Sequence, residues 1–177
     1  MNRIEELEPS ELPRLQAFLQ RVPEGERRWF KYDVLDSDVV AGWMRNEDAR
    51  HLVTVDDNGA VVAYGSVQPG QGWSSHVGEL TLIVDPAFRR RGLARPLAQR
   101  VLTEALGSGL QKVVVEVVAD ETSAVRLFVS LGFEPEALLR DHVRDREGHM
   151  RDLMILSHPV EDTWGALAAT GVEEEVT

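Results

Sequence analysis

The sequence predicts a single α/β domain built on a mixed central sheet with helices on both faces. β-Branched runs alternate along the chain with segments of helical spacing, an order typical of α/β folds. The length of 177 residues suits one such domain, because a chain of this size buries roughly 70% of its surface on folding. We expect the domain to span residues 1–160, since no repeat or linker interrupts them.

The first half of the chain predicts a strand, two helices and a three-stranded meander. Weak alternation favours a short strand over 3–8. Ser10 is a suitable N-cap for the first helix, and the acidic residues around Asp36 suit the N-terminus of the second. Asp57-Asn58-Gly59 predicts a turn between two strands. The expected helices are 11–21 and 36–46, and the expected strands are 51–55, 60–67 and 77–84.

The second half continues the alternation, which gives the order β-α-α-β-β-β-α-β-α-β-β, or about seven strands. The run KVVVEVVA is nearly all apolar, as in a strand buried on both faces. Gly132 is a natural terminator for the expected helix over 122–131. The expected elements are a helix over 92–106, a strand over 112–119, a helix over 122–131, and a hairpin of 137–143 with 149–157. The acidic segment 161–177 is expected to be weakly helical or disordered.

Composition excludes several classes of protein. The net charge of −11 argues against a nucleic-acid partner, because such binding depends on neutralising phosphates. The apolar runs are too short to cross a membrane, and the N-terminus lacks the apolar core of a secretion signal. There is no cysteine to form a disulfide or a thiolate metal site. We therefore expect a cytoplasmic protein with no metal, no nucleic acid and no membrane partner.

One short segment runs against the acidic composition. It follows the expected strand 77–84 with Asp85-Pro86, four arginines within seven residues, and a helix that opens at Gly92. Backbone N–H groups at a helix start have no intrahelical partner and bind anions such as a pyrophosphate. Gly92 adds room for close approach, since it has no Cβ. The alternative is an ordinary strand-to-helix turn whose arginines are merely solvated.

The same segment resembles the acyl-CoA signature of the GNAT superfamily of N-acetyltransferases, V-x-P-x-x-R-x-x-G-x-G/A. Its matching positions are Val84, Pro86, Arg89, Gly92 and Ala94. A second family pattern, A-x-x-L-[YF]-x-x-x-G-F, follows after one strand, at Ala124, Leu127, Phe128, Gly132 and Phe133. The two patterns in this order, with the element order over residues 3–158, predict a GNAT-like domain.

The resemblance implies that acetyl-CoA is the co-substrate and that strands four and five part to admit its pantetheine arm. Backbone groups of Leu82, Ile83 and Val84 would pair with that arm, and the N–H of Val84 would stabilise the oxyanion. The pyrophosphate would bind backbone N–H groups in the loop Arg89, Arg90, Arg91, Gly92, Leu93, Ala94 and Arg95. The alternative is an unbroken sheet with no slot.

The implied reaction is direct attack of a primary amine on the thioester within a ternary complex. An alkylamine is almost fully protonated at neutral pH, so a general base is useful. The resemblance makes Glu79 the candidate base, with a surface carboxylate as the alternative. Glu116, a lone acid in an apolar strand, either faces the cleft or pairs structurally, and we favour the structural role. Glu116 and His76 are the runners-up for the base, and for His76 we favour the alternative of a solvent-exposed strand residue.

The sequence departs from the family at two expected cofactor contacts. Phe128 stands where many members have a tyrosine thought to protonate the departing thiolate, and Phe128 has no proton to give. Water, Ser123, Ser130 or the substrate ammonium would replace that acid. Glu121 stands where an asparagine often contacts the pantetheine arm, and an ionised glutamate cannot donate a hydrogen bond. The alternative function is therefore a catalytically silent acyl-CoA-binding module that acts through a protein partner.

The acceptor is the least specified part of the site. Trp29, Tyr32 and Trp73 are candidate lining residues, although aromatic residues between helices are more often core. The acidic composition favours a cationic acceptor, either a small-molecule amine or a peptide N-terminus. The arginines of the last hairpin are expected to form a solvated ladder of ion pairs. A homodimer through this hairpin is a further expectation.

Overall fold

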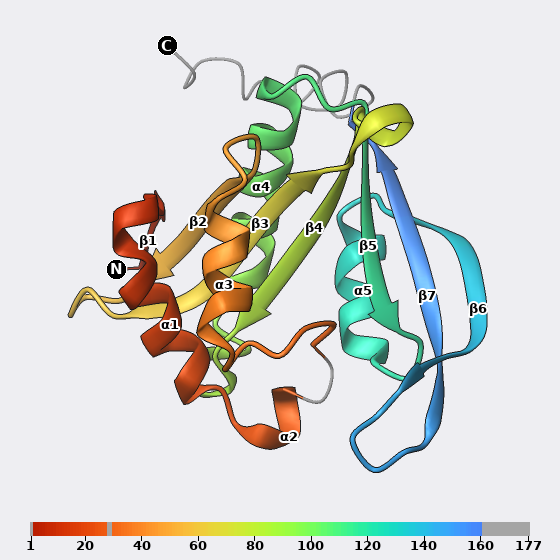
Figure 1. Ribbon diagram of the computed structural model, residues 1–177, viewed down its shortest axis with the longest axis horizontal. Helices are drawn as coiled ribbons and strands as arrows, with labels where there is room; N and C mark the ends of the chain where they lie inside the picture. Colours follow the sequence, from red (N-terminus) through yellow and green to blue (C-terminus); the bar gives the residue numbers. More distant parts are fainter. Residues whose placement is uncertain (1, 28–29, 161–177) are drawn as a thin grey trace.

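The computed structural model describes residues 2–27 and 30–160 (Figure 1). The expectations for Trp29 and for the segment 161–177 lie outside these residues. None of the helices in the two described ranges has the length and apolar content needed to cross a membrane.

The described residues form one seven-stranded mixed sheet, which confirms the predicted fold class. The strand order is β1-β2-β3-β4-β5-β7-β6. Neighbouring strands are antiparallel except β4 and β5, which run parallel. The strands are β1 (Arg3–Glu6), β2 (Arg50–Val55), β3 (Val61–Pro69), β4 (Val77–Val84), β5 (Lys112–Val118), β6 (Glu134–Arg144) and β7 (Met150–Pro159).

Five α-helices connect these strands, and four of them match the expected segments. The helices are α1 (Leu12–Arg21), α2 (Glu24–Arg27), α3 (Ser37–Met44), α4 (Ala94–Gly107) and α5 (Thr122–Ser130). The short helix α2 was not expected, because Pro23 and Gly25 predicted a break. Its single turn starts at the Pro23 carbonyl, which accepts from the N–H groups of Glu26 and Arg27. Acids in its first turn and an arginine in its last suit the helix dipole.

Two apolar cores cover the two faces of the sheet. The larger one packs α4 and α5 against the sheet, and the smaller one packs α1 and α3 against the opposite face. α4 approaches β3 so closely that a Cβ on Gly65 would lie 2.9 Å from Val101 Cγ2. In β5 burial alternates from Lys112 to Val117, and only Val118 at the end breaks the alternation. The expectation of a strand buried on both faces is therefore wrong, because Val114 and Glu116 face the less covered side.

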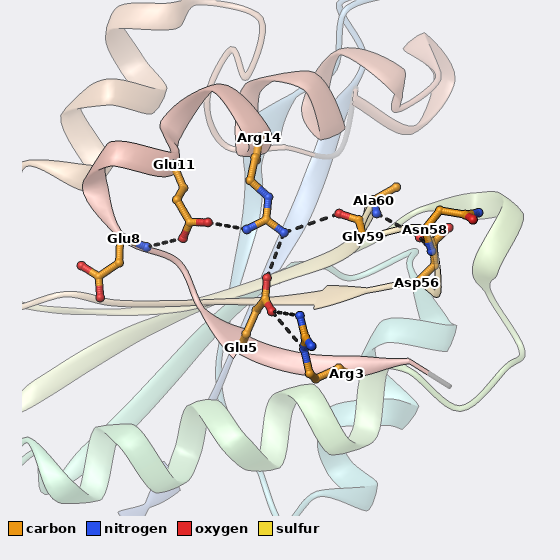
Figure 2. A network of polar contacts seen from close by, with 9 residues as sticks. All are labelled: Arg3, Glu5, Glu8, Glu11, Arg14, Asp56, Asn58, Gly59 and Ala60. Carbon is orange, nitrogen blue, oxygen red and sulfur yellow. Dashed lines mark hydrogen bonds and ion pairs between the residues drawn. The ribbon is translucent and has the colours of Figure 1, made fainter.

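A polar network fixes the amino-terminal strand and helix to the sheet (Figure 2). Arg14 of α1 forms ion pairs with Glu11 and with Glu5 of β1, the latter at 2.9 Å. It also donates to the carbonyl of Gly59, in the turn between β2 and β3. The hydrogen bond from Arg14 holds the pKa of Glu5 below its usual value. Arg14 therefore joins three segments on the side of the sheet away from β5.

Candidate active site

Strands β4 and β5 pair only at their beginnings and then part. The register runs from Val77 opposite Lys112 to Glu79 opposite Val114, and no pairing follows. Each strand remains fully paired on its other side, β4 with β3 and β5 with β7. Figure 1 shows the two strands diverging from their shared end. The opening is the slot between strands four and five that the sequence predicts.

The alternation of hydrogen bonds between β4 and β3 shows which backbone groups of β4 face this opening. Asp85 donates to the Val62 carbonyl at 3.0 Å, and Gly70 donates to the Val77 carbonyl at 2.8 Å. Bonded pairs alternate along an antiparallel ladder, so the polar groups of Leu82 and Val84 point away from β3. Those of Ile83 point toward β3, and its side chain is buried among α1 and α3. The backbone groups of Ile83 therefore do not face the opening, whereas those of Leu82 and Val84 do, and the contact of these two residues with an extended arm stays a prediction.

The loop between β4 and α4 gathers unpaired backbone donors. Arg90 and Gly92 have positive φ values of 59° and 75°. Alternating left-handed residues turn successive N–H groups toward one side, which makes an anion-binding concavity. In the described chain no hydrogen bond is donated by the N–H groups of Arg90 to Leu93. A Cβ on Gly92 would meet no atom within 4 Å, so the space over this residue is open.

The arginine side chains around the loop have separate partners. Arg89 forms an ion pair with Glu26 of α2 at 2.6 Å. The guanidinium of Arg91 lies over the ring of Phe88, 4.9 Å from its centroid. Arg95 donates to Ser130 Oγ at 2.7 Å and so ties α4 to the end of α5. The backbone thus supplies the unpaired donors of the loop, and the side chains brace it and add positive charge.

Two carboxylates meet at the point where β4 and β5 part. Lys31, from the segment between α2 and α3, lies 3.0 Å from Glu79 Oε1 and 3.1 Å from Glu116 Oε2. Both carboxylates therefore contact one ammonium, although they belong to different strands. Glu116 pairs with Lys31, and the pair lies at the mouth of the opening, so the two alternatives given for Glu116 are not exclusive.

The surroundings of Lys31 favour its charged form. Desolvation alone would lower the pKa of the ammonium, but the hydrogen bonds and charges of Glu79 and Glu116 outweigh it. The net effect raises the pKa of Lys31 above its ordinary value. The pair of carboxylates is thus a binding site for an ammonium group, and in this structure the ammonium belongs to the chain itself.

The three α5 residues expected to contact the cofactor lie in different environments. Phe128 is buried, and its ring packs edge-on against Phe133 at 5.3 Å. It thus belongs to the apolar core beneath the slot. Glu121 occupies the N-cap position of α5 without capping it through its side chain, and Ser123 is exposed in the first turn.

The expected acceptor residues are not all brought together. Tyr32 lines a cavity of about 460 Å³ between the segment after α2 and the β6–β7 hairpin. Trp73 is 95% exposed in the β3–β4 connection and forms no part of this lining. His76 lies at the closed end of the strand pair, where its carbonyl accepts from Gln111. It is exposed, as expected.

Sequence reasoning missed three residues of this region. Lys31 was not singled out, although in the sequence it lies between the candidate lining residues Trp29 and Tyr32. Arg144 and Arg146 were expected in a solvated ladder, but both line the cavity. Arg151 does form ladder-like pairs, with Asp120 and Asp145. Only the fold shows which arginines turn toward the segment after α2.

A strand opening lined by free backbone groups, followed by an anion-binding helix start, defines an acyl-CoA-dependent transferase. A model of the Acetyltransferase (GNAT) family matches residues 8–133 of the chain. A ribosomal protein bS18 alanine N-acetyltransferase from Salmonella typhimurium is 30% identical over 169 residues, covering 90% of this chain and 99% of the relative. The Escherichia coli K12 protein of the same name is 27% identical over 167 residues, with the same coverage. The chain belongs to the GNAT family and is an acetyl-CoA-dependent N-acetyltransferase.

Solved structures show the same fold. The Escherichia coli ribosomal-protein-S18-alanine N-acetyltransferase superposes with a TM-score of 0.74 and 24% identity, covering 90% of this chain and 94% of that one. The Salmonella typhimurium protein yncA, solved with its cofactor acetyl-CoA, gives a TM-score of 0.77 and 20% identity over 90% and 94%. The predicted resemblance is confirmed.

Replacing Gly92 with aspartate should weaken acetyl-CoA binding by at least about tenfold in calorimetric titration. The new carboxylate would face the anion-binding donors and would therefore lie beside the bound pyrophosphate. Two like charges 4 Å apart repel by about 4 kcal/mol at the effective dielectric constant of a protein surface. Gly59→Asp is the matched control, because Gly59 has φ +78° and equally open surroundings in the β2–β3 turn. Equal affinity in the two variants would remove the loop from the acetyl-CoA site.

Proposed function

We propose that this protein acetylates the α-amine of a peptide or protein N-terminus, with alanine as its first residue. The observation that carries the proposal is the ammonium of Lys31 held between Glu79 and Glu116 at the mouth of the strand opening. A site that binds one ammonium through two carboxylates fits the charged end of an acceptor. The choice of alanine rests on the two enterobacterial relatives, which are named for that residue of ribosomal protein bS18.

In the proposed reaction the acceptor ammonium replaces Lys31 between the carboxylates. A peptide α-amine has a pKa of about 7.7–8.0, so roughly a tenth is neutral at pH 7 in water. Two carboxylates raise that pKa and reduce the neutral fraction, so the bound amine needs a base to take its proton. We assign this role to Glu79. Glu116 is the second carboxylate that orients the amine.

Acetyl-CoA supplies the acetyl group as a thioester, and the chain's part is to hold and polarise it. Leu82 and Val84 present backbone groups to the extended arm, and the loop after β4 presents donors to the pyrophosphate. Val84 is the candidate donor to the thioester oxygen. Because Phe128 has no ionisable proton, the side chain at this position takes no part in proton transfer.

The first test is turnover of a hexapeptide with a free N-terminal alanine, measured as thiol release from acetyl-CoA. We expect acetylation at the α-amine, located by mass spectrometry. The matched control is the same peptide with a blocked N-terminus and one internal lysine, which should react at least tenfold more slowly. Equal rates would contradict selection of an α-amine. Binding of acetyl-CoA with no turnover of any peptide would favour the silent acyl-CoA-binding module.

The two carboxylates should differ in their pH profiles. Glu79→Gln is expected to lower kcat/KM by about 10²–10⁴ and to remove the acidic limb of the profile, because a general base contributes that much. Glu116→Gln should raise KM more than it lowers kcat and should keep the acidic limb. If Glu79→Gln keeps the wild-type limb while Glu116→Gln loses it, the two roles are exchanged.

Removing Lys31 should open the amine site. Lys31→Met is expected to lower KM for the alanine peptide several-fold with little change in kcat, because the acceptor no longer competes with an internal ammonium. Lys112→Met is the matched control. Lys112 also forms an ion pair with a glutamate, Glu136 at 2.7 Å, but it lies at the end where β4 and β5 are still paired. A higher KM in Lys31→Met would show that Lys31 assists acceptor binding.

A further inference from the structure

The cavity beside the amine site has an unexpected charge. Among the described residues that line it are four cations, Arg27, Lys31, Arg144 and Arg146, and one acid, Asp33. The chain as a whole has 30 acidic residues against 19 lysines and arginines. A lining rich in cations therefore departs from the composition of the protein.

Three of these cations have little or no compensation in the part of the chain that the structure describes. Arg144 forms no ion pair there, and Arg146 forms only a long one, 3.7 Å from exposed Glu24. The Nε of Arg27 is buried without a hydrogen-bond partner. Asp33 is engaged locally, since its carboxylate accepts from the Leu35 N–H. A buried donor without a partner is costly, so a ligand that accepts from it is favoured.

Lys31 connects the cavity with the amine site. Its residue lines the cavity while its ammonium contacts Glu79 and Glu116. The cavity therefore begins within one lysine side-chain length of the carboxylates. An extended peptide advances about 3.3–3.6 Å per residue, so the cavity lies beside the second and third residues of an acceptor whose α-amine replaces Lys31.

We propose that the cavity selects acceptors with a negative charge close to their reactive amine, namely a peptide N-terminus whose second or third residue is Asp or Glu. This specificity rests on the proposed function. The site would then present two carboxylates to the ammonium and, directly beyond them, the guanidinium groups of Arg144 and Arg146 to the acidic side chain. Arginine suits this role because its planar fork can pair with a carboxylate through two hydrogen bonds.

The charge order of the site also refines the expected acceptor. The net charge of the chain favours a cation, and the carboxylate pair satisfies that expectation for the amine alone. A polycationic acceptor would place its further charges against the arginines, which costs free energy through like-charge repulsion. The proposed acceptor therefore has one positive end followed by a negative group.

The test compares three hexapeptides that begin with alanine and continue with two glutamates, two glutamines or two lysines. Both kcat/KM and calorimetric affinity are measured on the full chain with acetyl-CoA and with coenzyme A, respectively. We expect the glutamate peptide to exceed the lysine peptide by at least about tenfold in both, with the glutamine peptide between them. Free glutamate serves as a separate arm, since it carries an ammonium and two carboxylates without a peptide chain.

Charge reversal then locates the preference. In Arg144→Glu/Arg146→Glu the order of the three peptides should invert, with the lysine peptide best. Arg45→Glu/Arg140→Glu makes the same change of net charge at two exposed positions outside the cavity lining and should keep the wild-type order. The milder pair Arg144→Gln/Arg146→Gln should abolish the preference, and it covers the case in which the reversed variant fails to fold.

The outcomes separate this inference from the proposed function. Binding of the glutamate peptide without acetylation would contradict the proposed function and support the charge selection. Acetylation of all three peptides at equal rates would support the proposed function and overturn the charge selection. An unchanged peptide order in the charge-reversed cavity would also overturn it. Preference for free glutamate over the glutamate peptide would assign the cavity to an amino acid.

Discussion

The parting of β4 and β5 is the constraint on which the rest of the site depends. It leaves backbone groups of Leu82 and Val84 without a neighbouring strand, a cost that an unliganded sheet normally avoids. The structure sustains it because each strand is fully paired on its other side. The core beneath α4 and α5 includes residues from both halves of the sheet, so it holds the halves together across the opening.

The opening also determines where charge gathers in this acidic protein. At one end the loop after β4 offers unpaired N–H groups and arginines, and at the mouth Glu79 and Glu116 face one ammonium. The cavity beyond them is again cationic. Positive, negative and positive regions thus follow one another across the site, in the order that the proposed pyrophosphate, amine and acidic side chain require. The arrangement assigns each ligand group a region of opposite charge, although the chain has a net charge of −11.

The parts of this site that could be predicted are those encoded locally. The loop after β4 is one contiguous segment, and its proline, arginine and glycine carry the family signature from which an anion site was predicted. Lys31 and Glu79 are 48 positions apart, and their contact depends on the path of the chain between α2 and α3. The orientation of the Ile83 backbone could not be predicted for a similar reason, because the direction of a backbone N–H depends on ladder phase, which β3 sets. The sequence could not predict that Arg144 and Arg146 line the cavity, because this depends on the position of the β6–β7 hairpin relative to α2.

The phenylalanine at position 128 is consistent with an α-amine as acceptor. Starting from the bound ammonium, transfer removes two protons from the acceptor nitrogen: Glu79 releases one of them to water before the attack, and the other is added to the departing thiolate. In water, a peptide α-amine, with a pKa of about 7.7–8.0, and a thiol resembling cysteine, with a pKa of about 8.5, differ little in proton affinity. The two carboxylates raise the pKa of the bound amine, and Glu79 takes the proton that they stabilise. The proton that leaves the attacking nitrogen can therefore reach the thiolate through water, without a strong acid beside the thiol. In this proposal the two carboxylates at the amine do the work of proton removal, and a phenol at position 128 is not required. Phe128 instead packs its apolar ring against Phe133 in the core.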